Sequence, residues 1–268
     1  MVEEHQLKVV EALFKQHQIR LDQRSKAHDF YLTDKGLIIE IHPRLYNDFN
    51  PKYKPLFDSV WIDAKHLYGS RYELEHTFEL LYLMNHLAKH LASSGIGLRS
   101  LLDISIYLNH FESIIDRSKL KRYLEQTSMS TYFNTILYLN HVYFGYKHNL
   151  LDQSFTLDEL QLDAVTIYIM TSGIHGKGEN FNAMAPRLVK SKSKTRLLLR
   201  ILFPKYVDMR AMYPIVGKCF LLYPFFVGIR LFKLLFIKRR SSFQKMKDLQ
   251  IEKDKLEKIK FVHKTLDL

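Results

Sequence analysis

Apolar residues recur at helical spacing along most of the chain and alternate at strand spacing in one short stretch. Residues 4–19 carry an apolar stripe, which predicts an amphipathic helix (Leu7, Val10, Leu13 and Phe14). Two β-prone runs, HDFYL and LIIEIH, flank the turn residues Asp34-Lys35-Gly36 and predict a β-hairpin. From about Ser70 to Asn149 the spacing is helical, so two or more packed helices are expected there.

The remaining segments are punctuated by proline and glycine. Residues 43–68 carry three prolines and mixed patterning, which predicts an ordered excursion with little regular structure. Residues 152–170 predict a helix, with Ser154 and Thr156 as candidate caps. The run SGIHGKGENFNAMAP then marks a boundary, and the helical pattern that follows is interrupted at three prolines (Pro204, Pro214 and Pro224). The fold class expected is α+β, with a small sheet followed by a mainly α-helical domain.

Composition places the chain among folded proteins of a reducing compartment. Hydrophobic residues make up 47% and charged residues 25% of the 268 residues, a balance that disordered chains do not show. The one cysteine, Cys219, excludes an internal disulfide framework. Because the N-terminus lacks a basic region followed by an apolar run, we expect a cytoplasmic protein.

The net charge of +12 is concentrated at one end of the chain. Residues 190–268 hold 20 Lys and Arg against 6 Asp and Glu, a net charge of +14, whereas residues 1–189 hold 20 against 22, a net charge of −2. This asymmetry is typical of a segment that meets a polyanion, and equally of a solvated helical surface.

One carboxylate stands out in the predicted hairpin. Alternation along LIIEIH places Glu40 on the same face as Ile38 and His42. A carboxylate between apolar neighbours is costly unless it is paired or binds a cation, so Glu40 is a candidate metal ligand. The competing interpretation, which the pattern alone favours, is a solvent-facing Glu40 paired with Arg44.

Two histidines and a glycine-rich loop are further candidates. His86 and His90 are four residues apart, so they share one helix face, the spacing that metal-binding helices use. Leu87 stands where a zinc protease would need glutamate, so a structural histidine pair is the stronger interpretation. The loop SGIHGKGEN lacks the order of a phosphate-binding P-loop.

The basic segment holds an apolar, aromatic-rich stretch at residues 220–240. Arg230, Lys233 and Pro224 interrupt it, so a membrane-spanning helix is not expected. Two interpretations stay open: a helix lying at the inner surface of an anionic membrane, and a helix packed on the central block. No nucleic-acid-binding motif accompanies the charge, so a nucleic-acid partner is not expected. The last helix, with Leu256 and Ile259 among charged residues, is a candidate docking or coiled-coil segment.

Several short motifs together resemble one protein family. The strand LIIEIHPRL, the helical stretches LLYLMNHLAKHL and LRSLLDISIYL, and the later segment LLLRILFPKYVDMRAMYP are similar to the uncharacterised bacterial nucleotidyltransferase family of the polymerase-β-like superfamily. Members carry a hydrophobic–Glu–hydrophobic–His strand followed by Arg-Leu, a helix with two histidines four apart, and an Arg followed by an Asp. The matching positions are Glu40, His42, Arg44, Leu45, His86, His90, Arg99 and Asp103.

The resemblance implies a function and a set of roles. It implies transfer of a nucleoside monophosphate from a nucleoside triphosphate to an unknown acceptor, with Mg²⁺ as cofactor and Glu40 as catalytic residue and metal ligand. Nucleotide contacts would come from His42, Arg44, His86, Lys89, His90, Arg99 and Asp103. The expected organisation is a partial nucleotidyltransferase α/β core (1–68), a helical domain (69–171), a glycine-rich basic loop (172–195) and basic C-terminal helices (196–268).

The chain departs from the family at the catalytic carboxylates. Members carry a Gly-Ser turn and an Asp-x-Asp pair ahead of the third carboxylate, but here only Asp22, Asp29 and Asp34 precede Glu40, and none lies in such a pair. We therefore expect that the chain starts within the fold, as an internally started reading frame, a remnant, or one half of a site that a partner completes. Since one carboxylate does not hold two Mg²⁺ ions, little or no transfer by this chain alone is expected. The alternative function is a non-catalytic helical protein whose basic tail binds an anionic membrane or nucleic acid.

Overall fold

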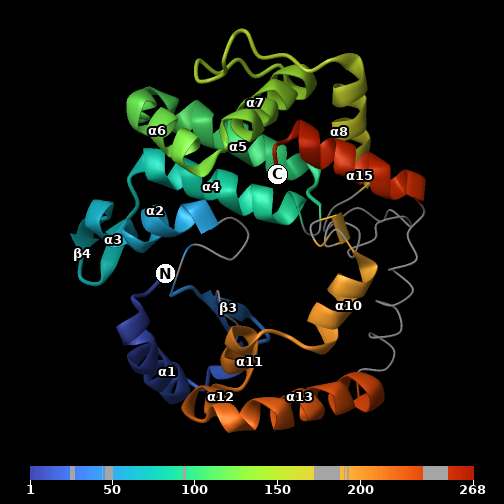
Figure 1. The fold of residues 1–268 in the computed structure, drawn as a ribbon. Helices are drawn as coiled ribbons and strands as arrows, with labels where there is room; N and C mark the ends of the chain where they lie inside the picture. Colours follow the sequence, from blue (N-terminus) through green and yellow to red (C-terminus); the bar gives the residue numbers. More distant parts are fainter. Residues whose placement is uncertain are drawn as a thin grey trace. The chain divides into compact units, whose positions relative to one another are not determined.

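The structure is a computed structural model that describes residues 1–24, 28–43, 45, 51–92, 95–171, 188–189, 191, 193–237 and 253–268. The chain forms two compact units, each discontinuous in sequence and each described here by itself (Figure 1). The N-terminal unit comprises residues 1–61 and 195–243, and the helical unit comprises residues 62–194 and 244–268. This division differs from the four consecutive ranges expected from the sequence, because the basic C-terminal segment is shared between the two units.

The N-terminal unit begins with a helix and a three-stranded antiparallel sheet. A 3-10 turn (Glu4–Gln6) leads into α1 (Leu7–Gln16), which confirms the helix predicted from the apolar stripe. The sheet has the order β1 (Arg20–Arg24), β2 (Asp29–Leu32), β3 (Ile38–Ile41). β2 and β3 form the predicted hairpin, whose turn contains Gly36 in the left-handed region at φ 77°. Strand β1 was not predicted, because its sequence RLDQR shows no apolar alternation. The lack of alternation agrees with the exposure of all five residues in the structure.

One face of the sheet is packed under α1. The ring of Phe14 meets the buried ring of Tyr31 edge-on, with centroids 4.8 Å apart. Arg24 joins the same two elements, because its guanidinium donates to Glu11 of α1 and to the buried Asp29 of β2, at 3.0 and 3.1 Å. The strand register therefore decides which side chains lie under the helix and which lie on the opposite face.

Residues 51–73 contain more regular structure than expected. The prediction of an excursion with little regular structure is wrong for residues 51–68, since short local helices and a hairpin form there. They are a 3-10 turn (Pro51–Tyr53), α2 (Lys54–Asp58), α3 (Val60–Asp63) and strands β4 (Lys65–Tyr68) and β5 (Arg71–Glu73).

The helical unit is built around α4 (His76–Leu91), whose buried side chains include Phe78, Leu81 and Met84. Helix α4 packs on α5 and α6, and both α5 and α6 pack on α7, which confirms the predicted helical block. Helix α8 packs on the last helix, α15, whose Ile259 and Val262 are buried, so the final helix docks within its own chain. The remaining bounds are α5 (Leu98–Phe111), a 3-10 turn (Glu112–Ile114), α6 (Arg117–Thr127), α7 (Ser130–Phe144), α8 (Glu159–Thr171) and α15 (Lys253–Thr265).

Helix α8 begins later than predicted. Asp158 rather than Ser154 or Thr156 caps it: the Asp158 carboxylate accepts a hydrogen bond from the backbone of Gln161 at 2.8 Å, and the Gln161 side chain accepts from the backbone of Asp158 at 3.1 Å. Ser154 instead hydrogen-bonds Asp152 at 2.7 Å. The prediction of the caps was therefore wrong, while that of the helix is confirmed.

The C-terminal part of the N-terminal unit is a set of short helices separated at the three prolines, as predicted. Their apolar side chains gather around the buried Met209, Val216 and Val227. Helix α13 packs here on α11, and packing of residues 220–240 on the central helical block stays a prediction. The elements are α10 (Lys194–Leu202), α11 (Tyr206–Met212), α12 (Pro214–Lys218), a 3-10 turn (Phe220–Leu222), α13 (Tyr223–Phe232) and a π-helical turn (Lys233–Ile237).

Candidate functional site

Glu40 lies on the open face of the hairpin. Antiparallel register pairs Phe30 with Glu40 and Tyr31 with Ile39, so Glu40 lies on the face opposite to the one covered by α1. Its side chain is 47% exposed, and its Oε2 lies 3.2 Å from Nε2 of His42. The solvent-facing interpretation of Glu40, which the pattern alone favoured, is confirmed and burial between apolar neighbours is wrong, because Ile38 on the same face is also exposed. The partner of Glu40 is His42; Arg44 lies outside the described residues.

His28 joins Glu40 and His42, and the sequence analysis missed it. Asp29 pairs with Ile41, so the next position outward on each strand places His28 across from His42. Their ring centroids are 4.7 Å apart, and one ligand atom from each of His28, Glu40 and His42 lies within 4.8 Å of the other two. The signal was present in the sequence, since a hairpin centred on Asp34-Lys35-Gly36 sets residues 28 and 42 opposite each other.

The other predicted nucleotide contacts lie in the helical unit. On α4, His86 and His90 are side by side, with Nε2 atoms 3.0 Å apart, and Lys89 is half-buried beside them. On α5, Arg99 and Asp103 are exposed and one helical turn apart. The structure thus brings Glu40 together with His42 and His86 together with His90, while Arg99 and Asp103 lie on a different helix of the helical unit from the two histidines. The loop SGIHGKGEN lies outside the described residues.

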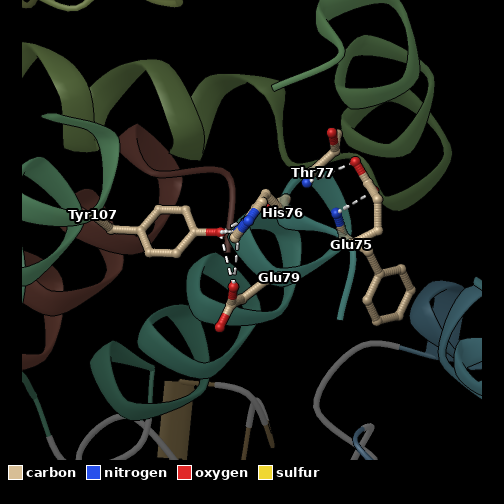
Figure 2. A network of polar contacts seen from close by, with 6 residues as sticks. Glu75, His76, Thr77, Glu79 and Tyr107 are labelled. Carbon is tan, nitrogen blue, oxygen red and sulfur yellow. Dashed lines mark hydrogen bonds and ion pairs between the residues drawn. The ribbon is translucent and has the colours of Figure 1, made fainter. Parts of the chain in front are cut away.

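A polar network holds the start of α4 (Figure 2). The Glu75 carboxylate caps the helix by accepting hydrogen bonds from the backbone of Thr77 and Phe78, both at 3.1 Å. Burial raises the pKa of Glu75, but the hydrogen bonds from Thr77 and Phe78 and the charge of Lys119 outweigh burial, so the pKa lies below its ordinary value. Glu75 is therefore a charged cap at neutral pH.

The second part of this network joins α4 to α5. The Tyr107 hydroxyl donates to Glu79 at 3.0 Å and to the backbone carbonyl of His76 at 3.1 Å. Burial, followed by the charge of Glu79, raises the pKa of Tyr107 far above its ordinary value, which keeps the hydroxyl a donor. Because the hydrogen bonds of Glu75 cap α4 and those of Tyr107 join α5 to α4, we interpret the network as structural.

Magnesium does not match the donors around Glu40. Mg²⁺ prefers oxygen ligands in octahedral geometry, and a two-metal site needs several carboxylates to hold both ions. Over the described ranges of the chain, the ligand group containing Glu40 offers one carboxylate and two imidazoles. These residues do not fit a pair of Mg²⁺ ions, so a magnesium site stays a prediction from the resemblance.

Comparison with known proteins identifies one family. The sequence model of a family described as "Uncharacterised nucleotidyltransferase" matches residues 1–145, which run from the first helix to Gly145 at the end of α7. No curated protein and no solved structure matches the chain. Within the described ranges, every helix is too short or too polar to cross a membrane.

Proposed function

Because the chain belongs to the uncharacterised nucleotidyltransferase family, we propose that it binds a nucleoside triphosphate and serves the transfer of a nucleoside monophosphate to a hydroxyl or amine acceptor. The observation that carries the proposal is the family match over residues 1–145, which includes both the strand of Glu40 and the helices of His86 and Arg99. In such a transfer the acceptor oxygen or nitrogen attacks the α-phosphorus. The bond to the bridging oxygen of the β-phosphate breaks, pyrophosphate leaves, and the acceptor loses a proton.

Positive and hydrogen-bonding side chains of the helical unit are the proposed phosphate contacts. Lys89 and Arg99 would neutralise phosphate charge, and Arg99 offers a planar fork of donors that suits phosphate oxygens. His86 and His90 would donate hydrogen bonds from α4, and Asp103, one helical turn after Arg99 on α5, would orient Arg99. The family resemblance adds His42 and Arg44 as further proposed nucleotide contacts.

The same proposal includes a limit on catalysis. Glu40 is the carboxylate that matches the family's third metal ligand, and among the residues that the structure describes the ligand group around it adds two imidazoles rather than further carboxylates. We therefore propose that the 268-residue chain binds nucleotide but transfers little or none of it without further carboxylates.

Nucleotide binding tests the first part of the proposal. We expect equilibrium dialysis with α-³²P-labelled ATP, GTP, CTP and UTP to show binding of at least one of them. Replacing Arg99 by alanine should weaken that binding by roughly tenfold or more, because a hydrogen bond to a charged group contributes about 1.5–3 kcal/mol. The matched control is Arg122→Ala, which removes another exposed arginine from the neighbouring helix α6.

Two results would contradict the proposal. If none of the four nucleotides binds, the proposal that the chain binds a nucleotide is wrong. If the Arg99 and Arg122 variants bind nucleotide equally well, Arg99 is not the proposed phosphate contact. Mg²⁺-dependent release of pyrophosphate by the purified chain, lost in Glu40→Gln, would contradict the limit on catalysis.

A second candidate function rests on an exposed apolar face of α13. Val227 and Phe226 pack into the core of the short helices, whereas Phe225 and Phe232, seven residues apart, are exposed on another face. The exposed Phe236 extends this face by one turn, and the exposed Lys233 adds positive charge. An apolar, aromatic face beside positive charge suits the surface of an anionic membrane.

Vesicle binding tests this candidate. We expect the chain to sediment with vesicles that contain phosphatidylserine, less so with phosphatidylcholine alone and less so in high salt, because salt screens the positive charge. The double variant Phe225→Glu/Phe232→Glu should bind about tenfold more weakly or worse, since charge at the acyl boundary opposes insertion. Ile167→Glu, an exposed position on α8, is the matched control. Equal sedimentation of the double variant and the control would exclude α13 as the contact.

A further inference from the structure

The open face of the hairpin carries three side chains whose ligand atoms converge. Nitrogen atoms of His28 and His42 and a carboxylate oxygen of Glu40 lie within 4.8 Å of one another. Within this group, His42 Nε2 and Glu40 Oε2 lie 3.2 Å apart. His28 has no role in the proposed nucleotide chemistry, so the convergence calls for its own explanation.

The backbone sets this arrangement. Asp29 and Ile41 form the last pair of the ladder between β2 and β3, and His28 and His42 lie one residue beyond this pair on their two chains. The backbone carbonyl of His42 accepts a hydrogen bond from the backbone of Val2 at 3.1 Å, which anchors the strand beyond the ladder. Phe30 packs edge-on against the His28 ring with centroids 4.5 Å apart, which limits the positions of that ring.

The donor set suits a transition metal. Two imidazoles and one carboxylate match the ligands of zinc and of other first-row divalent ions, whereas Mg²⁺ prefers oxygen alone. In tetrahedral zinc coordination, ligand atoms about 2.0–2.1 Å from the metal are about 3.3 Å from each other. The edge between His42 and Glu40 already has this length, at 3.2 Å. Three protein ligands leave the fourth position open.

We propose that His28, Glu40 and His42 form a binding site for a divalent transition metal of the zinc class. The site does not rest on the proposed nucleotide function, although both use Glu40. A metal held by the three side chains engages Glu40, so zinc and the nucleotide chemistry compete for the same carboxylate. His28 belongs to the metal site alone and therefore separates the two.

Titration of the chelator-treated full chain with Zn²⁺ in a calorimeter tests the site, with Co²⁺ absorption as a second readout of coordination geometry. We expect about one strongly bound zinc ion for each chain, not displaced by millimolar Mg²⁺. His28→Ala and His42→Ala should each weaken zinc binding more than about tenfold. Even the loss of a residue that only orients a metal ligand lowers metal affinity by roughly 10–100-fold. Glu40→Gln, at a half-exposed position that folding tolerates, should have the same effect.

Two controls distinguish this site from other histidines. His66→Ala removes an exposed histidine from the other hairpin and should leave zinc binding unchanged. The double variant His86→Ala/His90→Ala removes the close pair on α4 and should also leave it unchanged. Zinc binding that survives all three single substitutions, or that is lost with His86 and His90 instead, would overturn the proposal.

The nucleotide assay separates this proposal from the proposed function. His28→Ala should lose zinc but keep nucleotide binding, because His28 is not a proposed nucleotide contact. If neither the original chain nor any variant binds nucleotide, while the original chain binds zinc as expected, the proposed function is wrong and the metal site is supported.

Discussion

Replacing Leu108 by alanine is expected to lower the free energy of unfolding of the helical unit by about 2–5 kcal/mol. Leu108 is 0% exposed and lies on α5, which packs on both α4 and α7. The shorter side chain loses the free energy gained by burying the removed methyl groups away from water. It also leaves a cavity that the surrounding helices do not fully close. Urea unfolding followed by circular dichroism at helical wavelengths measures the loss.

The matched control for Leu108 lies two residues away on the same helix. Ile106 is 44% exposed, so Ile106→Ala removes similar apolar atoms but should cost less than about 1 kcal/mol. Equal losses of stability in the two variants would show that the packing of α5 differs from the arrangement described.

The second large effect is expected at His148, which is buried between α5 and the turn that follows it. Its Nε2 lies 3.1 Å from the Ser105 hydroxyl, and its Nδ1 lies 3.6 Å from the Glu112 carboxylate. His148→Leu leaves Ser105 and Glu112 without this partner, so we expect a loss of roughly 1–3 kcal/mol in the free energy of unfolding at pH 7.5. Chemical unfolding of the variant and the original chain under identical conditions measures it.

His148 also predicts a pH dependence of stability. Burial lowers the pKa of His148, and the opposing effect of Glu112 does not restore it to the ordinary value of 6.5. Between the folded pKa and 6.5 the unfolded chain therefore binds more protons than the folded one. The stabilisation is fully present above pH 6.5 and is lost as the pH falls from 6.5 towards the folded pKa.

Unfolding measured at several pH values between 5 and 8 tests this dependence. His148→Leu should show a shallower fall of stability below pH 6.5 than the original chain. His110→Leu, which removes an exposed histidine at the end of α5, should keep the original slope. A steeper fall in the His148 variant would reverse the assigned direction of the pKa.

The elements that the sequence determined by itself are those with a strong local period. The apolar stripe of residues 7–14 specifies α1, and the apolar steps through residues 76–144 specify the helical block, because each helix buries one face at 3.6-residue spacing. The hairpin followed from Asp34-Lys35-Gly36 between two β-prone runs, since the turn residues and the alternation agree. The family followed from short motifs carried by these same elements.

Only the tertiary structure decided which residues meet. Strand β1 forms by pairing with β2, and its polar sequence shows no local sign of this. The exposure of Glu40 depends on which face of the hairpin α1 covers, and the strand period alone does not name that face. Helix α13 joins the N-terminal unit through packing on α11, which its own sequence does not specify. Local periodicity specifies elements, whereas the exposure of a strand face and the make-up of a compact unit depend on contacts between residues far apart in the chain, which no local pattern encodes.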